Sequence, residues 1–327
     1  MTIKILNALI AIVGGVLGAM LLYWVLNQVA QRLPGKWEHR VKPYVFVGPA
    51  MLIIGFFLIY PALQTIHFSF ANRTSTAYVG LQNYVDLLGS PTFRSTLFNT
   101  LLWIVVVPTV VIGFGLLVAV MTDRLGARGE KSVKSLIFLP MAISAVSAGT
   151  VWAFIYTLRP EGQAQIGVLN AVVTAFGGDP VPWLQIDTAK LNSFLLMIIL
   201  IWTQTGFAMV LLSSAIKAVP EETLEAARLD GASEVQIFSR IILPQIWATV
   251  ITVFITVLIT VMKVFDIVYV MTNGRFDTDV VARAFFGELF TNGDRGRAAT
   301  IVVLLMVAVI PIMVYQVRHF KKQETNA

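Results

Sequence analysis

One short segment, Glu225-Ala226-Ala227-Arg228-Leu229-Asp230-Gly231, is rich in charge within a chain that is otherwise mostly apolar. Its two alanines leave little side chain on one face of a helix, so that another surface could approach the backbone closely. Its carboxylates and guanidinium could orient that surface through charge-assisted hydrogen bonds. This segment could therefore recognise a partner surface. The alternative is an amphipathic loop helix lying on a membrane, and residue types alone do not separate the two.

Helix start and stop signals surround this segment. Pro220 suits a first helical position, and Gly231 suits the left-handed position that follows a helix. Ser233 with Gln236 is a capping box that predicts a second helix, which Pro244 ends or kinks. The sequence therefore predicts a helix, a tight glycine turn and another helix.

A second set of residues could line a polar path. Thr252 and Thr256 recur at helical spacing in an apolar stretch, and Lys263 and Asp266 extend the same stripe. Charged residues at membrane depth generally face a cavity or a partner. The alternatives remain open, because a threonine hydroxyl can bond to its own preceding turn, and Lys263 with Asp266 could simply join two helices.

Trp202 and Gln204 combine an aromatic face with an amide group in another apolar stretch. Sugars suit such a pair, because their C–H faces stack on rings while their hydroxyls bond to amides. A glutamine that only packs helices together is the competing interpretation.

Several chemistries are excluded. The chain has no cysteine, and its three histidines are scattered, so no metal cluster is expected. The segment Gly126–Ser132 has the residue types of a phosphate loop, but Glu130 separates Gly129 from Lys131, so the required cradle does not form. No catalytic constellation is evident. We therefore predict no enzyme site and no bound cofactor.

The composition of the chain indicates which secondary-structure elements position these residues. Of 327 residues, 57% are hydrophobic and 13% charged, which predicts that lipid is the solvent for much of the chain. Uncharged runs of spanning length predict an all-α polytopic bundle of about seven transmembrane helices with a cytoplasmic helical loop. The expected spans are roughly 8–30, 44–66, 97–121, 135–157, 192–215, 245–265 and 299–317.

The net charge of +6 does not indicate nucleic acid, because the basic residues fall in the connections between spans. They are densest after the first span, between the third and fourth spans, between the fifth and sixth, and in the tail. By the positive-inside rule, these connections are cytoplasmic. The N-terminus is then expected outside, and the 225–231 segment and the C-terminus inside.

The spacing from Glu225 to Pro244 is Glu-Ala-Ala, three residues, Gly, nine residues, Ile-x-Leu-Pro. It closely resembles the signature of the membrane subunits of bacterial ATP-driven importers that work with a binding protein. The resemblance implies that Glu225, Ala226, Ala227 and Gly231 dock into a cleft on a separate ATPase. It covers residues 44–327, with residues 1–43 an additional N-terminal helix and linker before a six-helix core.

Further stretches resemble the maltose-type sugar branch: residues 80–84, 176–184 and 265–274. The third departs from that branch, because Asn273-Gly274-Arg275-Phe276-Asp277 stands where a Gly-Gly-Pro turn would follow the threonine. This variant resembles the α-glucoside permeases. Glycerol phosphate or polyamine permeases, and an ion-coupled secondary carrier, remain alternatives.

The resemblance also implies partners and a location. These are two ATPase subunits that bind ATP and Mg²⁺, a second and different permease subunit, and a periplasmic or lipid-anchored solute-binding protein. The expected location is the bacterial inner membrane.

Overall fold

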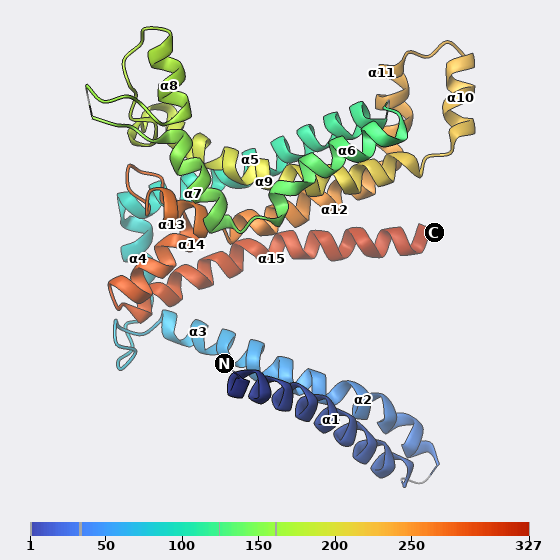
Figure 1. Ribbon diagram of the computed structural model, residues 1–327. Helices are drawn as coiled ribbons and strands as arrows, with labels where there is room; N and C mark the ends of the chain where they lie inside the picture. Colours follow the sequence, from blue (N-terminus) through green and yellow to red (C-terminus); the bar gives the residue numbers. More distant parts are fainter. Residues whose placement is uncertain (1, 33–34, 124, 161, 327) are drawn as a thin grey trace. The chain divides into compact units, whose positions relative to one another are not determined.

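The computed structural model describes residues 2–32, 35–123, 125–160 and 162–326, and these are mostly helical (Figure 1). Within them the only β pairing is a single bridge between Ala71 and Tyr78. Two compact units, Met1–His67 and Phe68–Ala327, are described separately below. The all-α prediction is confirmed.

The first unit consists of apolar helices. Tyr23 stacks on Phe46 with ring centroids 6.2 Å apart, while Leu9 and Leu17 are more than half exposed. Exposed aliphatic side chains of this kind are expected where lipid is the solvent. The elements are α1 (Thr2–Gln31), α2 (Lys36–Ile54), the π turn η1 (Gly55–Ile59) and α3 (Tyr60–Ser69).

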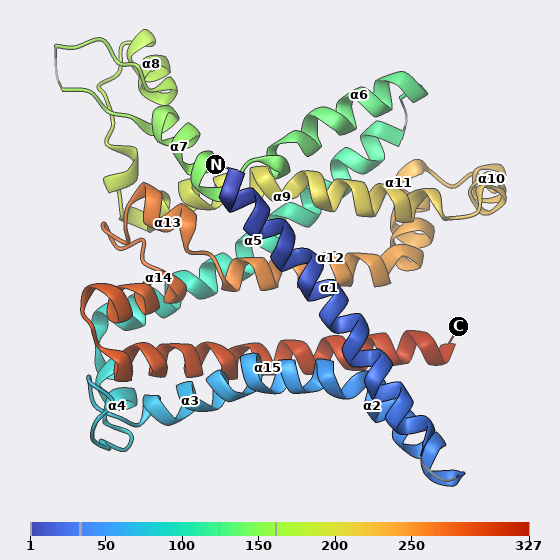
Figure 2. The ribbon, with the colours of Figure 1, turned by 60° about the horizontal axis from the view of Figure 1, so that its bottom comes forward.

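The core of the second unit is formed by three long helices: α5 (Pro91–Asp123), α9 (Leu191–Lys217) and α12 (Leu243–Met262). They run side by side in both ribbon views (Figures 1 and 2). Trp103 on α5 and Leu196 on α9 are fully buried between them. Their apolar faces form the main hydrophobic core of this unit.

The predicted span 135–157 is not one straight helix. It is α6 (Ala127–Phe138), the 3-10 turn η2 (Leu139–Ala142) and α7 (Ala145–Tyr156), with a bend of 102° between the two helical arms. Pro140 lies in η2, and Ser144 is extended and caps α7 by accepting a hydrogen bond from the Ser147 amide (3.2 Å). Proline geometry and a new N-cap break the helix, although its hydropathy is continuous.

The end of α6 contacts α9 at Gly206. A Cβ at this position would lie 2.5 Å from the Ile137 carbonyl oxygen, so only glycine permits the contact. Among the residues that the structure describes, six helices are long and apolar enough to span a membrane, or seven if the bent pair counts as one span. This agrees with the predicted bundle of about seven.

The remaining elements lie at the two ends of the second unit (Figures 1 and 2). One end carries α10 (Glu221–Leu229), α11 (Glu234–Ile237) and the π turn η5 (Phe238–Ile242). The other carries α4 (Gln82–Gly89), α8 (Val168–Ala175), η3 (Trp183–Gln185), η4 (Thr188–Lys190), α13 (Asp266–Met271), α14 (Val281–Phe286), the π turn η6 (Gly287–Thr291) and the start of α15 (Arg295–Asn326).

Candidate functional site

Residues 220–236, named the docking loop after the role that the sequence predicts for them, form the expected helix, glycine turn and helix. Gly231 has a φ of +81°. Its amide donates to the Arg228 carbonyl and the Ala232 amide donates to the Ala227 carbonyl, both at 3.0 Å. This is a Schellman motif, in which the residue after the helix must be left-handed. The turn therefore depends on glycine at position 231.

The second half of the loop is closed by the predicted capping box. The Ser233 hydroxyl accepts from the Gln236 amide (3.4 Å), and the Gln236 side chain accepts from the Ser233 amide (2.8 Å). Pro220 lies one residue earlier than predicted: it is the N-cap of α10, and Glu221 is the first helical residue. The shift reflects the extended ψ of Pro220, 130°, which places it just outside the helix.

The side chains at the turn are exposed and mixed in character. Glu225, Ala226 and Asp230 are exposed, and Arg228 pairs with Glu234 across the turn at 3.1 Å. Leu229 is 89% exposed and Val235 76% exposed. Sequence reasoning missed these two residues as docking candidates. Large apolar residues in an otherwise polar loop were the signal that could have identified them, because they have no core to join.

A cavity of about 720 Å³ separates the docking loop from the bundle. It is bounded on the bundle side by Asp123 and Lys217, and on the loop side by Leu224, Arg228 and Glu234. The loop therefore stands away from the bundle and presents two faces, one toward this cavity and one toward solvent.

Ion pairs tie the root of the docking loop to neighbouring helices. Lys217, the last residue of α9, contacts Glu130 on α6 at 2.6 Å and Asp123 on α5 at 3.8 Å. Lys134 also contacts Glu130, and it donates to the Ser213 hydroxyl at 2.5 Å. The segment that resembled an incomplete phosphate loop thus supplies the centre of a charge network.

The threonine stripe on α12 is satisfied by its own helix. The hydroxyls of Thr252, Thr256 and Thr260 each donate to the carbonyl four residues earlier, at 2.9, 2.8 and 3.1 Å. These hydroxyls are therefore already paired within the helix. This is the alternative in which the threonines bond to their own preceding turn. Thr256 remains exposed and Thr252 half-buried.

Trp202 and Gln204 do not line the same cavity. Trp202 lines an apolar cavity of about 470 Å³ with Phe114, Ile143 and Thr205, and its ring meets Trp152 edge-on at 5.9 Å. The cavity lies at the break between α6 and α7, which sequence reasoning did not anticipate. Gln204 is half-buried and does not line this cavity.

Lys263 and Asp266 lie on either side of a helix break. Helix α12 ends at Met262 and α13 begins at Asp266, so the expectation that both extend one continuous stripe is wrong. Both side chains line a cavity of about 220 Å³ with Thr260 and Phe265. They are exposed, and they make no ion pair with each other. Residues 263–265 are not helical and form the break between α12 and α13.

The turn at residues 273–277, which departs from the maltose-type pattern, has a strained backbone and is held by hydrogen bonds from other helices. Asn273, Phe276 and Asp277 have positive φ values of 51°, 56° and 56°. The Asn192 side chain donates to the Phe276 carbonyl (2.6 Å), and the buried Asn99 donates to the Asp277 and Asp279 carbonyls (2.8 and 2.9 Å). Left-handed residues of this kind persist only where surrounding contacts enforce them, and they cluster at functional sites.

Asp277 is the charged centre of this turn. It accepts hydrogen bonds from Ser95 at 2.5 Å and from Lys190. Burial raises the pKa of its carboxyl, but the bonds from Lys190 and Ser95 outweigh burial and leave the pKa below its usual value. Asp277 is therefore ionised at neutral pH. No group of His, Asp and Glu side chains within the described residues is arranged to hold a metal ion.

The amino-acid sequence is similar to those of two permease proteins. The chain is 42% identical over 334 residues to the alpha-glucoside transport system permease protein AglF of Rhizobium meliloti, with 98% of each chain covered. It is 45% identical over 280 residues to the osmoprotective compounds uptake permease protein GgtC of Synechocystis, covering 86% of this chain and 99% of the relative.

A solved structure shows the same fold. In a bacterial ABC transporter involved in the import of the acidic polysaccharide alginate, one chain superposes with a TM-score of 0.75 at 21% identity, covering 88% of this chain and 99% of that one. Residues 87–322 match the family described as binding-protein-dependent transport system inner membrane component. This chain belongs to that family.

Proposed function

We propose that this chain helps to form the translocation pathway of an ATP-driven importer for a neutral oligosaccharide, in the first place an α-glucoside. The observation that carries the substrate class is the similarity to an alpha-glucoside permease over 98% of both chains. An osmoprotective compound is the nearest alternative, on the similarity to GgtC. Glycerol phosphate and polyamines are the more distant ones.

The docking loop is the proposed contact with the ATPase. Its Schellman turn fixes the backbone, and the small Ala226 and Ala227 allow close approach on one face. Leu229 and Val235 supply exposed apolar surface that a partner would remove from water, and burial of apolar surface favours association. ATP and Mg²⁺ belong to two ATPase subunits, and this chain carries no cofactor.

The proposed assembly has further members. A second, different permease subunit completes the pathway, and a periplasmic or lipid-anchored binding protein delivers the sugar. The basic connections place the docking loop and the C-terminus in the cytoplasm and the N-terminus outside, in the inner membrane. Residues 1–43 precede the six-helix core as an additional helix and linker.

Within the chain, we place the path along Trp202, Gln204, Thr252, Thr256, Lys263 and Asp266. The cavities at Trp202 and at Lys263 lie at the two breaks in the helical framework, between α6 and α7 and between α12 and α13. Helix breaks at membrane depth are tolerated where backbone lines a cavity, which supports these two positions as parts of the path.

The experiment is ATPase stimulation of the reconstituted complex by loaded binding protein. Maltose, trehalose and sucrose should stimulate hydrolysis and drive ATP-dependent uptake, whereas glycerol 3-phosphate and spermidine should not. Stimulation by glycerol 3-phosphate or spermidine alone would show that the substrate class is wrong. Uptake that follows an ion gradient without ATP would favour a secondary carrier instead.

A further inference from the structure

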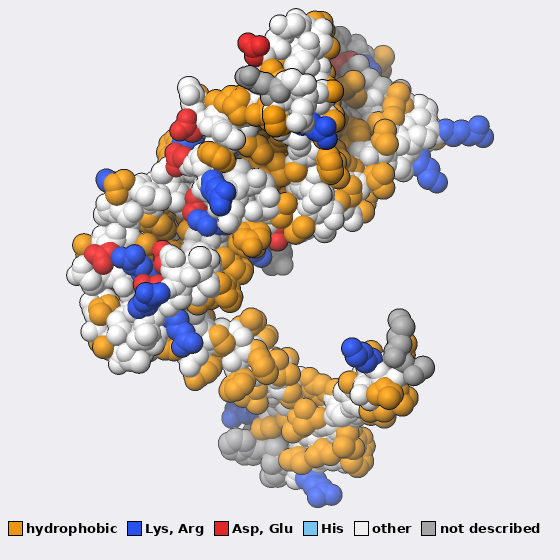
Figure 3. Space-filling view, turned by 60° about the vertical axis from the view of Figure 1, so that its left-hand side comes forward, with side chains coloured by type: hydrophobic (Ala, Val, Ile, Leu, Met, Phe, Trp, Pro, Cys, Tyr) orange, Lys and Arg blue, Asp and Glu red, His pale blue; other side chains and the backbone are white. Residues whose placement is uncertain are grey.

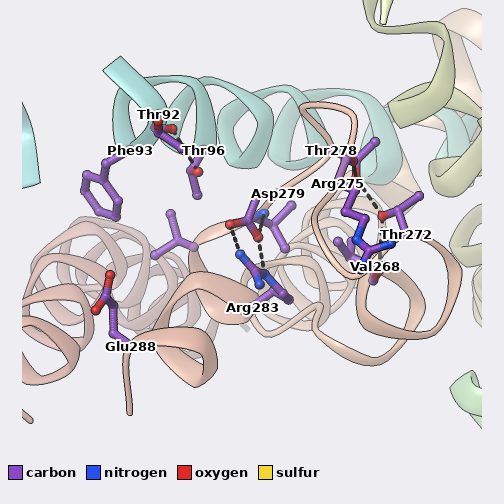
Figure 4. A network of polar contacts seen from close by, with 12 residues as sticks. Thr92, Phe93, Thr96, Val268, Thr272, Arg275, Thr278, Asp279, Arg283 and Glu288 are labelled. Carbon is purple, nitrogen blue, oxygen red and sulfur yellow. Dashed lines mark hydrogen bonds and ion pairs between the residues drawn. The ribbon is translucent and has the colours of Figure 1, made fainter. Parts of the chain in front are cut away.

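A second polar cavity lies at the end of the unit opposite the docking loop. It measures about 480 Å³, within the usual range of ligand pockets. Its walls come from α4, the first turns of α5, the end of α13, α14, η6 and α15. Figure 3 looks at this end, where acidic and basic side chains gather, and Figure 4 shows Phe93 and Thr96 on α5 with Asp279, Arg283 and Glu288 in the wall.

Charges of both signs line the cavity and largely neutralise each other. Arg283 donates to both carboxylate oxygens of Asp279. These hydrogen bonds raise the pKa of the Arg283 guanidinium, although partial burial opposes them. The Glu288 carboxylate accepts a hydrogen bond from the Asn292 side chain at 3.1 Å. Such a lining does not select a strongly charged ligand, because either sign would meet like charge.

Arg297 is the group best placed to receive a ligand. Its guanidinium lies 3.9 Å from Asp86 and 4.0 Å from Asp294, distances too long for hydrogen bonds. It lines the cavity together with Asn273, Thr291 and Glu288. Guanidinium donors, carboxylate acceptors and amides in one concave wall match the alternating donors and acceptors of vicinal hydroxyls.

An aromatic strip continues from this cavity. Phe265, Tyr269, Phe286 and Phe290 contact one another through ring pairs: Phe265–Tyr269 at 5.0 Å, Phe265–Phe286 at 4.1 Å and Phe286–Phe290 at 5.6 Å. These four rings line a smaller cavity of about 290 Å³, which shares Tyr269 and Arg283 with the larger one. Tyr269 and Phe290 are 52% and 72% exposed, so ring surface is free for C–H faces of a sugar.

The strip leads toward the candidate path. Phe265 lines both the 290 Å³ cavity and the 220 Å³ cavity that holds Lys263 and Asp266. Three cavities thus follow one another, each sharing at least one residue with the next. The walls include the strained turn at Asn273 and the π turn η6, and π turns occur frequently at functional sites.

We propose that this polar cavity, the receiving pocket, binds a neutral sugar or polyol and passes it along the aromatic strip toward Lys263 and Asp266. The proposal rests on the proposed import function, which places this end of the unit on the outer side of the membrane. Arg297 and Glu288 bind hydroxyls, and Tyr269 stacks on a ring face.

The test uses the complete permease and ATPase complex in vesicles, with the binding protein supplied on the outer side, and a photoreactive diazirine derivative of maltose. We expect the label on the segments 91–96 and 283–297, mapped by mass spectrometry. Arg297→Gln should reduce the labelling and raise the apparent KM for maltose uptake by about tenfold, because hydrogen bonds to a charged group are lost. Glu288→Gln, which preserves shape, is the second variant.

Arg295→Gln is the matched control, because it removes a guanidinium from the same helix two residues away and does not line the cavity. Labelling elsewhere, or equal labelling and KM in Arg297→Gln, Glu288→Gln and Arg295→Gln, overturns the receiving pocket. Wild-type uptake of maltose with either of those results leaves the import function standing. Absence of ATP-dependent uptake of every neutral sugar in the wild type overturns the import function itself.

Discussion

The two ends of the second unit differ in where their hydrogen bonds come from. In the docking loop, the Schellman turn, the capping box and the Arg228–Glu234 pair join residues at most six positions apart. At the end that carries the receiving pocket, outside the pocket lining itself, Asn99 donates to the Asp277 carbonyl across 178 positions and Thr300 donates to the Ser69 carbonyl across 231. One end is a local structure that projects from the bundle, whereas the other exists only when distant helices have assembled.

Because of this difference, substitutions at the two ends should have different effects. At the docking loop they should change partner binding and leave the stability of the chain intact. At the receiving pocket they should change stability, ligand binding or both.

The largest effect is expected for Gly231→Val. A β-branched residue at a φ of +81° costs roughly 1–3 kcal/mol locally, so the Schellman turn should be lost. Uptake should fall to background and ATPase co-purification should drop, while thermal unfolding of the permease stays near wild type. Gly126→Val is the control, because Gly126 has an extended conformation that valine tolerates. Normal uptake by Gly231→Val would contradict a docking role for this turn.

Asn99→Leu should be next. Asn99 is fully buried, and its loss removes the Asn99 donor from the Asp279 carbonyl and leaves the Asp277 carbonyl with only the longer bond from Lys190 at 3.3 Å. Each unpaired buried group costs about 1–3 kcal/mol, so the denaturation midpoint of the purified chain should fall clearly. Phe98→Leu, at an adjacent residue that is 54% exposed, should change it little. Equal midpoints for the two variants would mean that the turn is held by other contacts.

Leu229→Ala should weaken ATPase binding by about tenfold with no loss of permease stability. A fully desolvated leucine is worth about 1.5–3 kcal/mol, and Leu229 is 89% exposed until a partner covers it. Binding of the purified ATPase to permease in nanodiscs measures the change. Leu136→Ala is the control, since Leu136 on α6 is 70% exposed outside the loop. Similar affinities for both variants would remove Leu229 from the interface.

The smallest effect is expected for Arg228→Gln. Its ion pair with Glu234 is exposed on both sides, and such pairs contribute about 0.2–1 kcal/mol and weaken with salt. The helical content of a peptide spanning residues 218–240, measured with and without salt, should show this small difference. A large loss of helicity that salt does not reduce would show that Arg228 holds the loop by another means.

The parts of the fold that could be predicted from sequence are those with local causes. The apolar spans follow from hydropathy, and the Gly231 turn and the Ser233 capping box follow from the conformations that these residues favour. The 102° break at Pro140 was missed because the apolar run continues through it. The role of Lys263 and Asp266 at a helix end was missed because their spacing also fits one helix.

By itself, the sequence determined that the chain is a lipid-soluble helical bundle with an exposed, glycine-turned loop, because hydropathy and capping act over a few residues. Only the tertiary structure decided which polar groups meet. Phe93 is far in sequence from Glu288 and Arg297, and no motif singles out any of the three. They line one cavity because α5, η6 and α15 pack together. Long-range packing, unlike a turn, depends on the shapes of surfaces that no short segment contains.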